Sequence, residues 1–287
     1  MTHTLLVSTH DLATHLDDPD WIIFDCRFLL SQPDEKEKYY LKAHIPGAVY
    51  AHLDRDFSAP IIPGQTGRHP LPTPEEAARR FGVMGIGPGM QVVAYDDQGG
   101  SLAAVRLWWM LRWLGHEAVA VLDGGWQAWL EEDLPVRGGV ETRPPQTLIA
   151  RPRSGLYVTS DEVEQLRRDP GYRLVDVRAG ERYRGEVEPI DPVAGHIPGA
   201  LNAPYTNNLN EEGKFRLPSE LRENYAALLG DTPTGRVIFY CGSGVTSIHS
   251  ILALQLAGLG EARLYAGSWS EWIASRQRPV ALGPDPG

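Results

Sequence analysis

The chain has 287 residues, a length that predicts two domains at roughly 100 to 200 residues per domain. It has 27 Lys and Arg against 37 Asp and Glu, which gives a formal net charge of −10. A nucleic-acid interface is not expected, because phosphate contacts need a clustered cationic face. Hydrophobic residues make up 42% of the chain, as is usual for a globular protein, so neither disorder nor membrane residence is expected.

The first half of the chain alternates strands with helices. One helix is expected to begin after Ser8, and another after Thr73, where a capping box is combined with Pro at the first helical position. An apolar strand is expected at 92–95. The most apolar helical stretch, 102–114, is too short to span a bilayer and contains two arginines.

The second half repeats this alternation. The sequence Thr159-Ser-Asp-Glu162 is a capping box that opens a helix to about Arg168. Further helices are expected at 219–229, 245–257 and 268–275, and strands at 173–177, 201–203, 236–240 and 262–265. Continuous apolar strands between helices predict a parallel sheet that is covered on both faces.

An internal repeat relates the two halves. His44-Ile-Pro-Gly-Ala48 recurs 152 residues later, and the pattern Gly-x-Trp-x-x-Trp occurs at 124–129 and again at 267–272. These and other matches follow one another in the same order, so we expect a duplicated domain. The expected division is an N-terminal domain at 1–138, a linker rich in Gly, Pro and Arg at 139–155, and a C-terminal domain at 156–287.

The cysteines and the N-terminus predict a compartment. Two cysteines are too few for a disulfide framework, which favours a reducing environment. Residues 1–16 lack the basic start and the apolar run of a signal peptide. We therefore expect a cytoplasmic protein.

Cys241 lies where the predicted strand 236–240 ends, and the loop 242–246 leads from it into a helix. In an open parallel sheet, ligands bind beyond the carboxyl ends of the strands. Gly242 and Gly244 allow the loop to curl, so that successive backbone N–H groups face the sulfur and stabilise a thiolate together with the helix dipole. Cys241 is expected to be a nucleophile at neutral pH.

Three other interpretations bear on this loop. A free cysteine is often only a small buried side chain, and we expect that of Cys26, which aligns with an apolar strand position of the second half. A cysteine phosphatase would need Arg six positions after the nucleophile, where this chain has Ser247. Asp96 takes the place of Cys241 in the first half, so a single active site is expected.

These features together resemble the two-domain rhodanese-like sulfurtransferases over nearly the whole chain. The resemblance is carried by the duplicated pattern, both His-Ile-Pro-Gly-Ala stretches, the Cys241 loop, and Trp108-Trp109 before Leu122-Asp-Gly-Gly125. It implies the α/β class, with tandem duplicated rhodanese domains that each have a five-stranded parallel sheet flanked by helices on both faces. Members that use thiosulfate typically have cationic side chains directly after the cysteine. Here Gly242 and Ser243 stand there, so the loop is similar to that of the 3-mercaptopyruvate sulfurtransferases.

The resemblance also implies roles for individual residues. Cys241 matches the sulfur-accepting cysteine, and Ser243, His69 and Asp54 match a proton relay. Arg182 matches an arginine that holds the anionic group of the substrate, whereas no second arginine occurs near 190–191, where the family has one. The loop residues expected to contact the substrate are Gly242, Gly244, Val245 and Thr246.

Each of the carried-over positions also has an ordinary interpretation. His69 could be a solvated loop histidine, Asp54 a surface carboxylate, and Arg182 part of a solvated charged face. Both His69 and Asp54 lie in the segment 49–70, which is longer than its counterpart in the second half. A domain that has lost its nucleophile can still contribute a loop to the site of its partner.

The expected activity is the transfer of a sulfane sulfur from 3-mercaptopyruvate, through a Cys241 persulfide, to a thiol, thioredoxin or cyanide. Thiosulfate:cyanide sulfur transfer and a non-catalytic binding module are the alternatives. The expected partners are thus a small-molecule sulfur donor and an acceptor of the thiol or thioredoxin type. No cofactor is expected, and no metal, because the His, Cys and carboxylate residues show no ligand spacing.

Overall fold

The computed structural model describes residues 2–287. Contacts between residues divide the chain into two compact units. The first consists of residues 2–59, Leu71–Arg153 and Glu211–Phe215, and the second of Pro60–Pro70, Ser154–Asn210 and Arg216–Gly287. The segment Pro60–Pro70 therefore packs with the second unit, although it lies within the N-terminal range 1–138.

The first unit contains a parallel sheet with the strand order β1-β5-β4-β2-β3. Its strands are β1 (Leu6–Val7), β2 (Trp21–Asp25), β3 (Val49–Tyr50), β4 (Gln91–Tyr95) and β5 (Val119–Leu122). Its helices are α1 (Thr9–Ala13), α2 (Glu35–Lys42), α3 (Leu53–Phe57), α4 (Pro74–Val83), α5 (Ala103–Trp113) and α6 (Gly125–Glu131).

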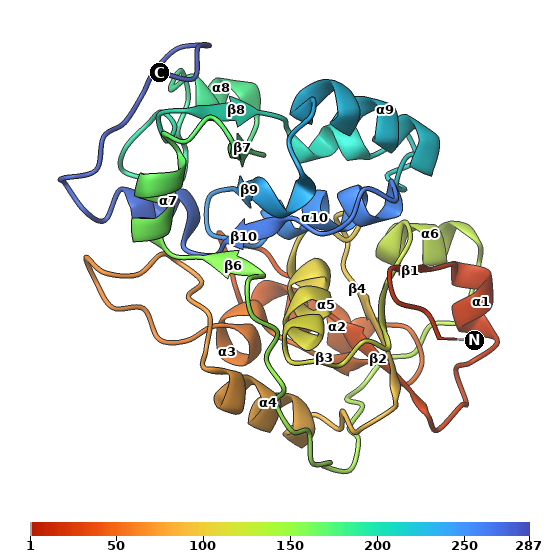
Figure 1. Ribbon diagram of the computed structural model, residues 1–287. Helices are drawn as coiled ribbons and strands as arrows, with labels where there is room; N and C mark the ends of the chain where they lie inside the picture. Colours follow the sequence, from red (N-terminus) through yellow and green to blue (C-terminus); the bar gives the residue numbers. More distant parts are fainter. Residues whose placement is uncertain (1) are drawn as a thin grey trace. The chain divides into compact units, whose positions relative to one another are not determined.

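The second unit repeats this topology, with the strand order β6-β10-β9-β7-β8 in a parallel sheet (Figure 1). Its strands are β6 (Tyr157–Val158), β7 (Arg173–Asp176), β8 (Ala200–Asn202), β9 (Val237–Tyr240) and β10 (Arg263–Tyr265). Its helices are α7 (Ser160–Leu166), α8 (Gly180–Tyr183), η1 (Tyr205–Asn208), α9 (Pro218–Leu229), η2 (Thr234–Arg236), α10 (Ser247–Leu256) and α11 (Ser268–Trp272). The shared strand order confirms the duplication.

Strand β9 shows why helices cover both faces of its sheet. Its side chains alternate between the faces. Ile238 and Tyr240 pack in one core cluster with Trp269 of α11, whereas Phe239 meets the ring of Tyr225 from α9, with 6.1 Å between ring centroids. All four residues of β9 are buried, as the continuous apolar run predicts. Since β9 pairs with β7 and β10, it is an inner strand, and the loop that follows it begins in the middle of the sheet.

The capping box predicted at Thr159 is confirmed, whereas only half of the one predicted at Thr73 forms, because the Glu76 carboxylate accepts from Arg79 and Arg80. Thr159 and Glu162 form the reciprocal capping box at the start of α7. Thr73 accepts the backbone N–H of Glu76, with Pro74 as the first residue of α4. Helix α10 begins at Ser247, two residues later than expected, because the preceding loop is not helical.

The repeated histidines hold the same turn in each unit. His44 and His196 are fully buried, and their Nδ1 atoms lie 2.7 Å from the carbonyl oxygen of Tyr40 and 2.8 Å from that of Tyr183. Each ring also stacks on the tyrosine that it bonds. The pairs have the same geometry in both units, so they support the fold rather than a site that only one unit has.

The expected linker is extended and hydrogen-bonded rather than loose. The backbone N–H of Gln146 donates to the carbonyl of Gly82 at 2.8 Å, and that of Arg151 donates to the carbonyl of Leu114 at 2.9 Å. The chain follows the first unit in this way as far as Arg153. Nowhere in 2–287 is there a helix with the length and apolar character that crossing a membrane requires.

Candidate active site

The loop after β9 places Cys241 at the carboxyl edge of the second sheet. Cys241 is 4% exposed, and Gly244 has a φ of +75°. A Cβ atom at Gly244 would collide with the backbone oxygen of Ala266, so only glycine fits at this position. The curl of the loop thus depends on a glycine that the sequence supplies.

Helix α11 ties the loop down from one side. The N–H of Cys241 donates to Ser268 Oγ at 3.1 Å, while the N–H groups of Trp269 and Ser270 donate to the carbonyls of Cys241 and Gly242 at 3.1 and 2.9 Å. Ser268 itself has a φ of +55°, which is an unfavourable conformation for a residue with a side chain. This backbone strain lies at the residue of α11 that accepts the N–H of Cys241.

The remaining backbone donors of the loop are available to a ligand. Within residues 2–287, the N–H groups of Gly242, Ser243, Val245 and Thr246 donate to no protein acceptor. Buried or half-buried N–H groups without a partner are rare in folded proteins. Four of them next to a cysteine leave this loop able to donate hydrogen bonds to an anion.

Ser243 has a histidine partner from a distant part of the sequence. Ser243 Oγ lies 2.8 Å from His69 Nδ1, and both side chains are buried, at 8% and 5% exposure. His69 reaches the loop because Gly67 allows the segment to pass close to α11: a Cβ atom there would lie 2.6 Å from the carbonyl oxygen of Gly267. The solvated-histidine interpretation of His69 is therefore wrong.

Asp54 lies in the first unit, in helix α3, and its backbone N–H donates to His52 Nδ1 at 3.1 Å. His52 is the N-cap of that helix. The carboxylate of Asp54 takes part in the predicted relay only if it meets His69 of the second unit, and that role stays a prediction.

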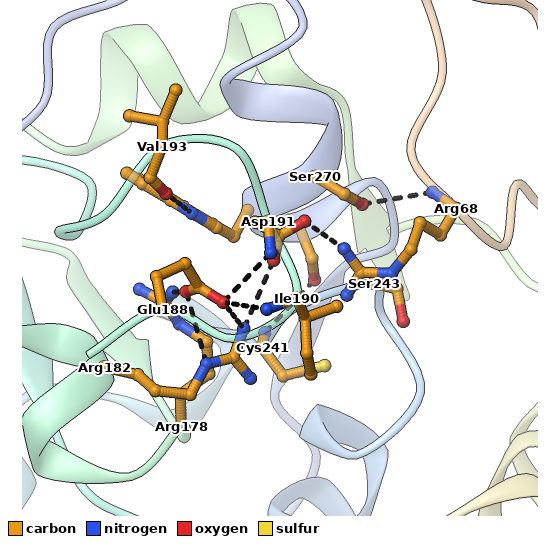
Figure 2. A network of polar contacts seen from close by, with 12 residues as sticks. Arg68, Arg178, Arg182, Glu188, Ile190, Asp191, Val193, Cys241, Ser243 and Ser270 are labelled. Carbon is orange, nitrogen blue, oxygen red and sulfur yellow. Dashed lines mark hydrogen bonds and ion pairs between the residues drawn. The ribbon is translucent and has the colours of Figure 1, made fainter. Parts of the chain in front are cut away.

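Arg182 of α8 is held by two carboxylates (Figure 2). Its Nη2 donates to Glu188 Oε1 at 2.7 Å and to Asp191 Oδ2 at 3.2 Å, and its Nε donates to Glu188 Oε2 at 3.2 Å. Its neighbour Arg184 instead pairs with Glu186 at the surface. Arg182 is thus a fixed guanidinium and not part of a solvated charged face.

Glu188 and Asp191 also lie at the site, although neither was predicted as a site residue. Their side chains are only 4% and 3% exposed. Burial disfavours the ionised form of Glu188, but hydrogen bonds from Arg182 and from the N–H of Asp191 outweigh it, so the pKa of Glu188 is lowered. Burial raises the pKa of Asp191, and Arg68 and Arg182 oppose that rise. Two carboxyl groups shortly after Arg182 were the only signal in the sequence.

The corresponding loop of the first unit follows β4 and begins at Asp96, which is fully buried. Its carboxylate accepts the N–H groups of Gln98 and Gly100 at 2.9 Å each and that of Leu102 at 3.0 Å. Burial raises the pKa of Asp96 to about 6, although these backbone donors lower it. The donors of this loop are therefore occupied by a side chain of the loop itself.

Cys26, the other cysteine of the chain, lies in a different environment from Cys241. Cys26 is fully buried beside β2, with its sulfur 3.8 Å from the carbonyl oxygen of Phe24. Burial raises its pKa well above the ordinary value for a thiol. Cys26 is an inert core residue, as predicted. Across the described chain, no group of three or more His, Cys, Asp or Glu side chains could hold a metal ion.

Comparison with known proteins agrees with this architecture. The family model "Rhodanese-like domain" matches residues 8–132 and 159–275. The "Probable 3-mercaptopyruvate sulfurtransferase" of Pseudomonas aeruginosa is 46% identical over 284 residues, covering 99% of this chain and 100% of that protein. The "Putative thiosulfate sulfurtransferase SseB" of Mycobacterium tuberculosis is 37% identical, with 97% of both proteins covered.

A solved structure shows the same fold at high similarity. The 3-mercaptopyruvate sulfurtransferase from Leishmania major has a TM-score of 0.84 and 32% identity, and the match covers 96% of this chain and 76% of that one. The family model matches the chain twice, the relatives match over its full length, and the two sheets are equivalent. These findings agree. The chain belongs to the rhodanese-like family and is a two-domain sulfurtransferase enzyme.

Proposed function

We propose that this enzyme takes the sulfane sulfur of 3-mercaptopyruvate onto Cys241 and passes it to a thiol, to reduced thioredoxin or to cyanide. One observation carries the proposal: a cysteine loop with free backbone donors has a serine–histidine pair, 2.8 Å between Ser243 Oγ and His69 Nδ1, built into it. The names of the relatives from Pseudomonas aeruginosa and Leishmania major support the same donor.

Binding of the donor begins with its carboxylate. A Cβ atom placed on Gly242 would lie 3.8 and 3.9 Å from the two terminal nitrogens of Arg182, so this guanidinium lies beside the residue that follows the nucleophile. A carboxylate bound to Arg182 would leave the sulfur of a three-carbon donor within reach of Cys241. The guanidinium fork suits a carboxylate because it can donate two parallel hydrogen bonds.

Sulfur transfer then needs one proton. The Cys241 thiolate attacks the donor sulfur, so an S–S bond forms while the C–S bond breaks, and its electron pair goes to the enolate of pyruvate. The enolate takes up a proton, for which Ser243 and His69 form a route, with Asp54 as the proposed third member. Cysteine thiolate, thiol donor and proton thereby give cysteine persulfide and pyruvate.

The persulfide anion would be stabilised by the loop donors of Gly242, Ser243, Val245 and Thr246. An acceptor thiol or cyanide then removes the outer sulfur and regenerates the thiolate. We place the reaction in the cytoplasm, because both cysteines are free and an acceptor thiol needs a reducing compartment.

Thiosulfate is the second candidate donor, and the relative from Mycobacterium tuberculosis favours it by name. Thiosulfate is a dianion, and its leaving group, sulfite, is a stable anion that needs no proton. The Ser243–His69 pair would then have no purpose in the first half-reaction. The structure of this site therefore favours 3-mercaptopyruvate.

The test is to incubate the purified protein with each donor and to weigh the intact chain. We expect the mass of one sulfur atom to be added with 3-mercaptopyruvate, and the addition to be lost in Cys241→Ser. Cys26→Ala is the matched control, because it removes the only other cysteine and should leave the addition intact. Sulfur addition to Cys241→Ser, or none to the native chain, would overturn the proposal. A higher kcat/KM with thiosulfate would reassign the donor.

A further inference from the structure

Arg68 is a second guanidinium at the nucleophile loop, and the established activity does not account for it. Its backbone N–H donates to Ser270 Oγ at 3.1 Å, and the N–H of Ser270 donates to the carbonyl of Gly242 at 2.9 Å. Ser270 therefore holds both the catalytic loop and the chain segment that delivers Arg68 and His69. This arrangement fixes the backbone of Arg68 relative to Cys241.

The side chain of Arg68 lies over the residue next to the nucleophile. A Cβ atom on Gly242 would be 2.7 Å from Arg68 Nη2, closer than either terminal nitrogen of Arg182. Within residues 2–287, neither Arg68 Nη2 nor Arg182 Nη1 donates to a protein acceptor. Each guanidinium thus keeps one free donor nitrogen beside Gly242, where a side chain would meet Arg68.

Asp191 joins the two guanidiniums (Figure 2). Its Oδ1 accepts from Arg68 Nη1 and its Oδ2 accepts from Arg182 Nη2. Because its side chain is 3% exposed, the carboxylate cannot swing away into solvent, and it sets the angle between the two arginines. Glu188 fixes Arg182 from its other side. Glu188 also accepts from Arg178, which in turn pairs with Asp176, so three guanidiniums are matched by three buried carboxylates and the donor hydrogens carry little net charge.

We propose that Arg68 binds the anionic group of the sulfur donor together with Arg182, and that Asp191 is the positioning residue for both. The inference rests on the proposed function, since the anion is taken to be the carboxylate of the donor. Two donor nitrogens whose charge is balanced suit a carboxylate monoanion, which needs hydrogen bonds more than a strong positive field. The specificity of the site for a monoanion thus depends on a residue of the segment Pro60–Pro70.

The first experiment compares Arg68→Gln with the native enzyme in steady-state kinetics. We expect KM for 3-mercaptopyruvate to rise about 10- to 100-fold, with a much smaller change in kcat, because a charged hydrogen bond to the donor is lost. Arg184→Gln is the matched control, since Arg184 pairs with Glu186 at the surface. An unchanged KM in Arg68→Gln would overturn the inference.

The second experiment does not depend on sulfur transfer. Alkylation of Cys241 by iodoacetate, which is an anion, is compared with alkylation by neutral iodoacetamide. The measured quantity is the alkylation rate with iodoacetate divided by the rate with iodoacetamide. We expect this ratio to fall about 10-fold in Arg68→Gln and to keep its native value in Arg184→Gln. A ratio that is the same in all three proteins would overturn the inference.

The two experiments separate the inference from the proposed function. Anion preference at Cys241 without persulfide formation would overturn the function and leave Arg68 as an anion-binding residue. Persulfide formation in Arg68→Gln with the native KM for 3-mercaptopyruvate would overturn the role of Arg68 and leave the proposed function in place. If Arg68→Gln does not fold, as judged by circular dichroism, Arg68→Lys serves instead. It keeps the charge but loses the fork, and we expect an intermediate KM, whereas a native KM would contradict the role of the fork.

Discussion

The loops after β4 and β9 occupy equivalent places in the two sheets, yet they use their backbone donors in opposite ways. In the first unit, Asp96 is buried, and its carboxylate accepts four backbone N–H groups that follow it, those of Gln98, Gly100, Leu102 and Ala104. In the second unit, Cys241 stands at the equivalent position, and four N–H groups of the loop have no protein acceptor in the described chain. The backbone donors of the loop are bound by a carboxylate of the loop itself in one unit and are left without a protein acceptor in the other.

The difference shows what a catalytic loop has to leave unsatisfied. Closing the cradle with a side chain removes the cost of unpaired backbone donors, which is about 1 to 3 kcal/mol for each buried group. Keeping it open accepts that cost until a thiolate, persulfide or substrate binds. The second unit offsets this with the bonds from Ser268, Trp269 and Ser270 that hold the loop in place.

The largest effect should come from replacing His69, which contacts Ser243 of the loop after β9. His69→Gln should lower kcat with 3-mercaptopyruvate by about 100-fold, because the enolate then lacks its proton route. With thiosulfate the loss should be less than about 3-fold, since sulfite leaves without a proton. His10→Gln, at an exposed position of the first unit, is the control. An equal loss with both donors would mean that His69 only supports the loop.

A smaller effect is expected when Asp191, the carboxylate between Arg68 and Arg182, loses its charge. Asp191→Asn removes one negative charge and frees Arg68 and Arg182 from their common partner. The ratio of kcat/KM for thiosulfate to that for 3-mercaptopyruvate should rise about 10-fold, because a more positive site favours the dianion. Asp231→Asn, which changes an exposed carboxylate, should leave the ratio unchanged. A fall in the ratio would contradict the charge-balance argument.

The last test concerns only the first loop and should not affect activity. The pKa of Asp96 is about 6 in the folded chain, above its ordinary value of about 4 when unfolded. Its contribution to stability is therefore complete below about pH 4 and is lost as the pH rises through about 6. Between pH 4 and pH 7 the native chain should lose about 2 kcal/mol of unfolding free energy relative to Asp96→Asn.

Urea unfolding at a series of pH values measures this difference. Sulfur transfer should be the same in Asp96→Asn and in the native chain, which is the internal control. A difference in unfolding free energy that does not change with pH would show that Asp96 stays ionised throughout, with its backbone donors outweighing burial.

Much of the architecture was predictable from local patterns. The apolar runs that became β4 and β9, the capping residue Thr159 and the repeated His-Ile-Pro-Gly-Ala turn each depend on neighbours close in sequence. Cys241 was predictable for the same reason, because a strand end, two glycines and a helix start are all local features. The expected helix start at 245 was two residues early, since the loop continues to Thr246.

The rest of the site depends on contacts that no local pattern contains. His69 meets Ser243 across 174 residues of sequence, and Arg68 meets Asp191 across 123. Resemblance to a family identified His69, whereas Arg68, Glu188 and Asp191 were not predicted as site residues. Near 190–191 the family has an arginine and this chain has none.

The amino-acid sequence by itself determined the duplicated sheets, the strand that ends at Cys241 and the presence of Asp96 at the equivalent position, since these follow from periodicity, capping and residue identity over short spans. Only the tertiary structure decided that the segment Pro60–Pro70 belongs to the second unit and that Asp191 links two arginines beside the loop. The physical reason is that buried charges and hydrogen-bond donors choose partners by position in space, and the fold brings those partners together from residues that are far apart along the chain.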